Sequence, residues 1–279
     1  MKKLSGLKKG FITIGLIILS SLCAIGIPLA INHLVVKKIF IAIGLEVDYG
    51  YIRVAISMLV ILPAIYVLFF RTFDSKTRLN LGINLFLKDT AIGLSLGVAS
   101  IGLILLCIGI TGSFKITGIN RNVAFLEVVC LVLSFALLEE FLFRGVIFRL
   151  IKMRHSSKAA LIVSSLIFSV AHFGNDAFNI MSLLSILLLG LLLGLVYSRT
   201  QSLWLVTCLH FAWNYTQVFF GTVLSGTRMF DQGVFFHSEL LGPDIISGGA
   251  FGPENSIFAV LVLLGVIFLV NHFFNLIRT

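Results

Sequence analysis

The stretch Leu137-Leu138-Glu139-Glu140-Phe141-Leu142-Phe143-Arg144 places two carboxylates and an arginine inside an apolar run that covers residues 123–150. An ionised carboxylate in a lipid-facing helix costs roughly 2.5 kcal/mol or more, so such groups persist where they face a protein interior or a water-filled cavity. His172, His210 and Asn214 lie in further apolar runs. These polar residues in apolar surroundings form the candidate functional site.

The composition is that of an integral membrane protein. Of the 279 residues, 58% are hydrophobic and 12% are charged, and the mean hydropathy is +1.09. Apolar runs of about 20 residues recur along the chain, and each can cross a hydrocarbon core about 30 Å thick. We therefore predict a single integral membrane domain over residues 1–279, an all-α polytopic transmembrane bundle of about eight spans, whose motif-bearing core is about 123–220.

The eight predicted spans are residues 11–36, 52–70, 91–110, 123–150, 159–172, 180–198, 202–220 and 257–277. The first follows four lysines, as a signal peptide would, but its length and the lack of a small-residue cleavage site favour a span. Pro28 is expected to kink it. The longest loop, residues 221–255, is rich in glycine and acidic side chains, and loops of this length are functional lids or mobile segments.

The basic residues predict the orientation of the chain. The net charge is +9, but lysine and arginine fall in short loops, which membrane orientation explains better than nucleic acid binding. With the N-terminus inside, 15 of the 21 fall in inner segments and 6 in outer ones. We predict a multi-pass protein of the cell membrane with both termini cytoplasmic. The four cysteines lie in apolar runs without a C-x-x-C pair and are predicted to be core residues, neither disulfides nor ligands: Cys23, Cys107, Cys130 and Cys208.

The two adjacent glutamates are predicted to have different roles. Glu140 and Arg144 are four residues apart, with the acid N-terminal, which favours an intrahelical ion pair. Glu139 is rotated by about 100° around the helix and has no such partner. A carboxylate near low dielectric holds a proton more readily, which suits a general base that acts on water. Glu140 is thus predicted to be structural and Glu139 chemical.

Three further side chains complete the predicted site. His210 and Asn214 share one face of the seventh span, and His172 ends the fifth span, four residues after Phe168. An imidazole can exchange a proton with a reacting group, and an amide can donate to a developing oxyanion. The set of a base, two histidines and an amide around one cavity suits the attack of an activated water on an amide.

Each residue also has a plain structural interpretation. A lone histidine inside a membrane is often a hydrogen-bonded packing residue, and an asparagine is commonly an interhelical contact. The Glu-Glu-x-x-x-Arg run alone is compatible with a structural ion pair or a proton relay. The sequence has no H-E-x-x-H helix, no G-x-S-G with a partner histidine and no paired aspartates. Any chemistry would therefore use glutamate and histidine.

The three motifs resemble a known family. Glu139-Glu140-x-x-x-Arg144, Phe168-x-x-x-His172 and His210-x-x-x-Asn214 occur in the order found in the CAAX prenyl protease and bacteriocin-processing (CPBP, formerly Abi) family. Its members are intramembrane endopeptidases and include the type II CAAX prenyl endopeptidases. The resemblance covers residues 126–220 approximately, and no motif position departs from it.

The resemblance implies a role for each motif residue. Glu139 would be the catalytic glutamate, His172 would help to hold and activate the water, and His210 and Asn214 would stabilise the oxyanion. Glu140 and Arg144 would brace the site. Family members have been described both as metalloproteases and as metal-independent glutamate proteases. We favour direct activation of water without a required cofactor; if zinc were bound, its ligands would be Glu139, His172 and His210.

The expected substrate is a membrane-associated peptide or protein tail that reaches a cavity open towards the cytoplasm. Eukaryotic relatives cleave prenylated tails, and bacterial-type members are linked to peptide maturation and bacteriocin self-immunity. Two other functions stay open at this point: a non-catalytic membrane immunity or scaffold protein, and a proton-coupled transporter. A transporter would be expected to have paired broken spans in two related halves, which the sequence lacks.

Overall fold

The computed structural model describes residues 85–278 and shorter stretches before them, namely 15, 26–28, 30–42, 53, 57–61 and 64. The first two predicted spans lie largely outside the described residues, as do Cys23 and the neighbours on which a kink at Pro28 would depend. Two short helical elements precede the main body: η1, a π-helix at Asn32–Val36, and α2 at Lys37–Ala42.

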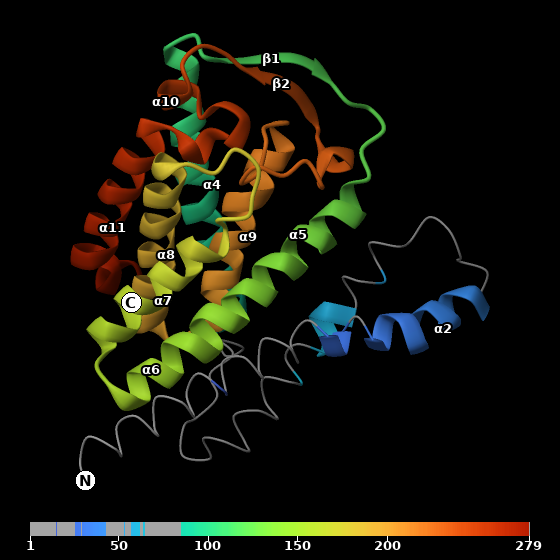
Figure 1. Cartoon of the computed structure of the whole chain (residues 1–279), viewed down its shortest axis with the longest axis vertical. Helices are drawn as coiled ribbons and strands as arrows, with labels where there is room; N and C mark the ends of the chain where they lie inside the picture. The colour runs from blue at the N-terminus through green and yellow to red at the C-terminus, as the bar shows by residue number, and fades with distance from the viewer. Residues whose placement is uncertain are drawn as a thin grey trace.

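From residue 85 onward the protein is mostly helical, and its helices pack into one bundle (Figure 1). The elements are α4 (Phe86–Ile110), β1 (Phe114–Ile119), α5 (Phe125–Glu140), η3 (Phe141–Phe148), α6 (Arg149–Arg154), α7 (Ser157–Ala171), α8 (Ile180–Thr200), α9 (Leu203–Phe219), η4 (Asp231–Gly233), β2 (Phe236–Leu240), α10 (Asp244–Ser247), η5 (Gly249–Phe251), η6 (Pro253–Asn255) and α11 (Ile257–Arg278).

The six later predicted spans coincide with helices, with ends that differ by a few residues. Among the described residues, α4 and α8 are long and apolar enough to cross a membrane. The helix α7 and the segment Ile257–Phe273 of α11 are apolar but shorter. The structure thus supports a mostly helical protein with two clear candidate spans, and the number of about eight stays a prediction.

Pairs of glycines allow two close helix contacts in the bundle. A Cβ atom on Gly97 of α4 would lie 2.5 Å from the carbonyl oxygen of Leu209, and one on Gly93 would lie 2.7 Å from that of Leu205. On α8, Gly190 and Gly194 bring that helix against α7 in the same way. Small residues four positions apart are typical of closely packed membrane helices. These contacts hold α9 against α4, and α7 against α8.

The α5 helix changes its winding directly after the two glutamates. The N–H of Phe141 donates to the carbonyl oxygens of both Leu137 and Leu138, and a π-helix continues to Phe148 before α6 begins. Wider turns of this kind occur frequently at functional sites. The predicted fourth span is therefore a continuous helical run with a π-helical segment at the site.

The loop predicted at residues 221–255 has more structure than the sequence indicated. Its strand β2 pairs antiparallel with β1, from Phe114 opposite Leu240 to Ile119 opposite Phe236. The two strands lie at the end of the bundle opposite α6 (Figure 1). The α10 helix and three short 3-10 helices account for much of the rest of this loop. The all-α prediction therefore missed one two-stranded sheet.

Candidate active site

The predicted ion pair between Glu140 and Arg144 is present and buried. Arg144 Nη1 donates to Glu140 Oε1 over 2.7 Å, and the two side chains are 1% and 0% exposed. Arg144 Nη2 donates to the carbonyl oxygen of Gly190 over 3.1 Å, and the guanidinium carbon lies 4.6 Å from the ring centroid of Phe168. Arg144 therefore connects η3 with both α7 and α8.

His210 links the two glutamates. Its Nδ1 lies 2.8 Å from Glu140 Oε1. Because the carboxylate accepts this bond, as it does the bond from Arg144, Nδ1 carries a proton and donates. The other ring nitrogen, Nε2, faces Glu139 and lies 3.8 Å from its Oε2. That separation is too long for a direct hydrogen bond, and Oε2 is buried without a hydrogen-bond partner among the described residues.

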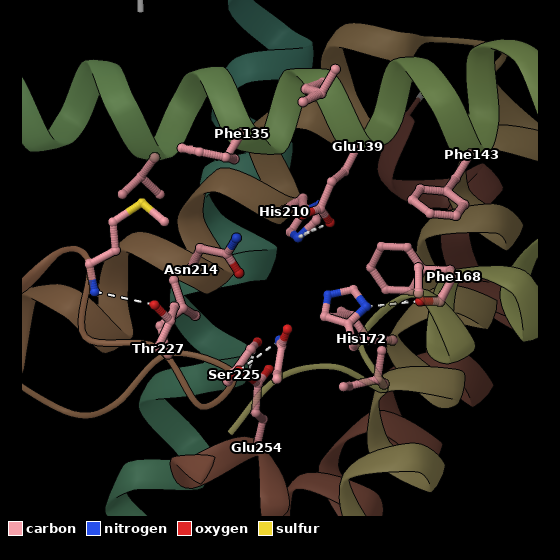
Figure 2. Close-up of a pocket in the computed structure, with 18 of the residues that line it drawn as sticks. Phe135, Glu139, Phe143, Phe168, His172, His210, Asn214, Ser225, Thr227 and Glu254 are labelled. Atoms are coloured by element: carbon pink, nitrogen blue, oxygen red, sulfur yellow. Dashed lines mark hydrogen bonds and ion pairs between the residues drawn. The ribbon is translucent and has the colours of Figure 1, made fainter. Parts of the chain in front are cut away.

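The two glutamates have different surroundings, as their spacing predicted. The Glu139 side chain is 28% exposed and lines a cavity, whereas that of Glu140 is fully buried within its ion pair. Glu139 points from α5 into the cavity (Figure 2). Glu139 is thus accessible to a reactant, and Glu140 is not.

His172 approaches the cavity from the end of α7. Its Nδ1 lies 2.8 Å from the carbonyl oxygen of Phe168, which can only accept, so Nδ1 donates and the neutral ring has its lone pair on Nε2. Asn214 lies one turn after His210 on α9 and lines the same cavity (Figure 2). Within the described part of the chain, His172 Nε2 and the Asn214 amide have no hydrogen-bond partner. Both are available to a bound substrate.

The cavity has a volume of about 420 Å³ and a mostly apolar lining. It brings together all four residues predicted to act in catalysis, which come from three helices: Glu139, His172, His210 and Asn214. Ligand sites are typically apolar clefts with a few convergent polar groups. The arrangement can hold a peptide segment and position a water against one of its carbonyl groups.

Sequence reasoning missed the wall of the cavity that lies opposite Glu139. Glu254, which is 2% exposed, accepts hydrogen bonds from Trp213 Nε1 at 3.1 Å and from the hydroxyl of Ser225. Asn175 Nδ2 donates to the carbonyl oxygen of Ser225 over 2.8 Å. Glu254, Ser225 and Asn175 all line the cavity. No local pattern indicated this wall, because Glu254 and Trp213 are 41 residues apart.

The three side chains named from the sequence as possible zinc ligands, Glu139, His172 and His210, all line this cavity. Among the described residues, no three histidine, cysteine, aspartate or glutamate side chains are arranged so that they could hold a metal ion. His210 and His172 each donate from Nδ1, to Glu140 and to a backbone carbonyl, so the Nε2 atoms of both rings are left free in the described part of the chain. Metal-binding histidines commonly have this arrangement, and the zinc ligands named from the sequence stay a prediction. The three described cysteines, Cys107, Cys130 and Cys208, are free thiols.

The described part of the chain combines a mostly helical fold, two candidate membrane spans, and a cavity that contains an acid, two imidazoles and an amide. A family model described as type II CAAX prenyl endopeptidase Rce1-like matches residues 121–216. The match covers about a third of the chain, includes all three motifs and confirms the resemblance recognised in them. It indicates a membrane-embedded protease of the CAAX class. Comparisons with curated proteins and with solved structures give no match.

Proposed function

We propose that the protein is an intramembrane endopeptidase that hydrolyses a peptide bond in a membrane-associated peptide or protein tail. The observation that carries the proposal is the position of Glu139, whose side chain is 28% exposed and lines the same cavity as His210. A carboxylate accessible from a cavity can act as a general base on a water held there. His172 and Asn214 line the same space.

In the proposed reaction, Glu139 removes a proton from a water molecule, and the water oxygen attacks the carbonyl carbon of the scissile bond. The Nε2 lone pair of His172 accepts a hydrogen bond from the water and orients it. The proton held by Glu139 then passes to the nitrogen of the leaving amine as the carbon–nitrogen bond breaks. Water is the only co-reactant, and Glu139 ends the cycle ionised.

The carbonyl oxygen becomes negative during this attack and needs donors. The Asn214 amide can donate directly, and His210 can donate from Nε2 when the ring is an imidazolium. Glu140 stabilises that charged ring, because its carboxylate already accepts from His210 Nδ1. Arg144 keeps the Glu140 carboxylate in place. Glu140 and Arg144 are therefore positioning residues rather than catalytic ones.

The substrate class follows from the cavity and from the family. A mostly apolar lining favours a lipidated or hydrophobic segment, and the matched family is described by its action on prenylated CAAX proteins. Peptide maturation and bacteriocin self-immunity are the bacterial roles that the resemblance suggests. We place the protein in the cell membrane with both termini cytoplasmic. In that orientation residues 221–255 are external, so a substrate from the cytoplasm would reach the cavity from the side away from this loop.

The test uses the full-length protein in liposomes with a membrane peptide library whose cleavage products are read by mass spectrometry. Glu139→Gln, His172→Ala and His210→Ala should each reduce cleavage by at least about 100-fold, the range typical of a lost general acid or base. Glu127→Gln is the matched control, because Glu127 lies on the same helix but does not line the cavity, and it should retain activity. Folded Glu139→Gln protein that cleaves like the wild type would refute the proposal.

The same variant separates the proposal from the two other functions. In a bacteriocin protection assay, full protection by Glu139→Gln would favour a non-catalytic immunity or scaffold protein. Proton-coupled uptake into liposomes that Glu139→Gln abolishes, without any peptide cleavage by the wild type, would favour a transporter.

A further inference from the structure

Glu254 is a buried acid that the proposed reaction does not use. Its side chain lines the cavity from the wall opposite Glu139, and only 2% of the residue is exposed (Figure 2). It lies outside the segment that the family model matches. Glu254 therefore contributes a second carboxylate to the cavity from a part of the chain that the family model does not cover.

The partners of Glu254 anchor it but do not neutralise it. The indole of Trp213 donates to Oε2 and the hydroxyl of Ser225 donates to Oε1, and both donors are uncharged. Within the described part of the chain, Glu254 forms no ion pair. A carboxylate can accept about four hydrogen bonds, so it retains capacity after these two. Because Glu254 lines the cavity, these unused acceptor positions belong to a side chain that a bound molecule could contact.

The cavity has two acidic side chains and no permanent positive charge among the described residues that line it. Lysine and arginine are absent from this lining, and of its two histidines His210 donates to Glu140 and His172 to a backbone carbonyl. Arg144 is directed to Glu140 and to a backbone carbonyl, outside the lining. A buried carboxylate without a counter-charge is costly. A positive charge on a bound molecule would supply the counter-charge for the Glu254 carboxylate.

The chemistry favours an organic cation over a metal ion. Among the described residues, Glu254 is not part of any group of three acidic, histidine or cysteine side chains that could hold a metal ion. The cavity is large enough for a peptide segment with a long side chain, and its apolar walls suit the aliphatic part of lysine or arginine.

We propose that Glu254 determines substrate specificity by binding a positively charged group, an ammonium or guanidinium, that lies close to the scissile bond. The inference rests on the proposed endopeptidase function and adds a substrate class to it. The cation can come from a lysine or arginine side chain or from a free amino terminus. In each case the substrate spans the cavity, with its carbonyl at Glu139 and its positive charge at Glu254.

The first test measures which peptides are cut. Wild-type protein in mixed micelles is given a proteome-derived peptide library, once untreated and once with N-terminal amines acetylated, and cleavage sites are read by mass spectrometry. We expect basic residues to be enriched about ten-fold at one fixed position, since a hydrogen bond between charged groups contributes at least that factor. Cleavage at a fixed distance from the amino terminus that acetylation abolishes would instead assign the cation to the amino terminus.

Three variants test the role of the charge. Glu254→Gln should reduce the enrichment to about one while cleavage of neutral peptides continues. Glu239→Gln removes an exposed acid from the same loop, outside the cavity, and should keep the enrichment. Trp213→Phe removes the indole donor and part of a buried ring while keeping the Glu254 charge, so it should lower stability and weaken the enrichment less than Glu254→Gln does. Unchanged enrichment in Glu254→Gln would overturn the inference and leave the endopeptidase function intact.

The second test does not depend on catalysis. The melting temperature of the purified full-length protein is measured with n-butylammonium, which resembles the end of a lysine side chain, and with 1-butanol as the neutral control. The ammonium should raise the melting temperature more than the alcohol, and Glu254→Gln should remove the difference. No difference in the wild type, or an equal one in the variant, would refute cation binding even if no peptide were cleaved.

Discussion

Replacing Arg144 with methionine tests how strongly the fold depends on the buried ion pair. The guanidinium and the Glu140 carboxylate are 1% and 0% exposed and 2.7 Å apart. Methionine has a similar length and fills most of the same volume, so the main loss is the positive charge. Glu140 would then be a buried carboxylate whose remaining partner is His210.

The expected destabilisation is about 3–5 kcal/mol, the usual cost of removing one partner from a buried pair. The double variant Arg144→Met/Glu140→Gln should recover part of it, because glutamine carries no charge but can still accept from His210 Nδ1. We expect a coupling energy of about 1–3 kcal/mol between the two positions. The exposed pair of Arg228 and Asp231, 3.7 Å apart, supplies the control, and Arg228→Met should cost less than about 1 kcal/mol.

The assay is the free energy of unfolding in mixed micelles, followed by tryptophan fluorescence. Two outcomes would refute the reasoning. One is an Arg144→Met variant that is no less stable than Arg228→Met. The other is a double variant whose destabilisation equals the sum of the two single ones, which would mean that the charges do not stabilise each other.

Two other predictions use the same unfolding assay. Gly97→Ala should lower stability by about 1–3 kcal/mol, because its Cβ would lie 2.5 Å from a backbone oxygen of α9. Gly102→Ala on the same helix is the control: its Cβ would meet nothing within 4 Å, so the change should be neutral or stabilise by up to about 1 kcal/mol. Ser202→Ala should lower the free energy of unfolding by about 1–2 kcal/mol, because this buried hydroxyl caps α9 and also donates to a carboxylate on α4. Ser156→Ala, at the exposed cap of α7, should lower it by about 0.5–1 kcal/mol. The reverse order within either pair would contradict the packing described.

The helices and the ion pair were predictable because they depend on local sequence. Apolar runs located six helices to within a few residues, since each run has to satisfy its own backbone hydrogen bonds. The spacing of four between Glu140 and Arg144 predicted their contact for the same reason. The number of membrane spans stays a prediction, because among the described residues only α4 and α8 have the length and hydropathy of a span.

The loop that follows α9 was not predictable in its detail. The β1 and β2 strands are short and more than 100 residues apart, so no local sequence pattern predicts their pairing. Turn residues and acidic side chains in residues 221–255 are equally compatible with a solvated loop. The packing of this loop onto α5 and α9 decides that it forms a wall of the cavity.

The sequence by itself identified the residues that are predicted to carry the chemistry: an acid with a paired neighbour, two histidines and an amide, each inside an apolar run. Only the tertiary structure decided how these groups meet. His210 and Glu140 are separated by 70 residues, and their contact depends on how α9 packs against α5. Glu254 reaches the cavity by the same means, through Trp213 on α9. Spacing along one helix defines a face, whereas contacts between helices depend on the packing of the whole bundle.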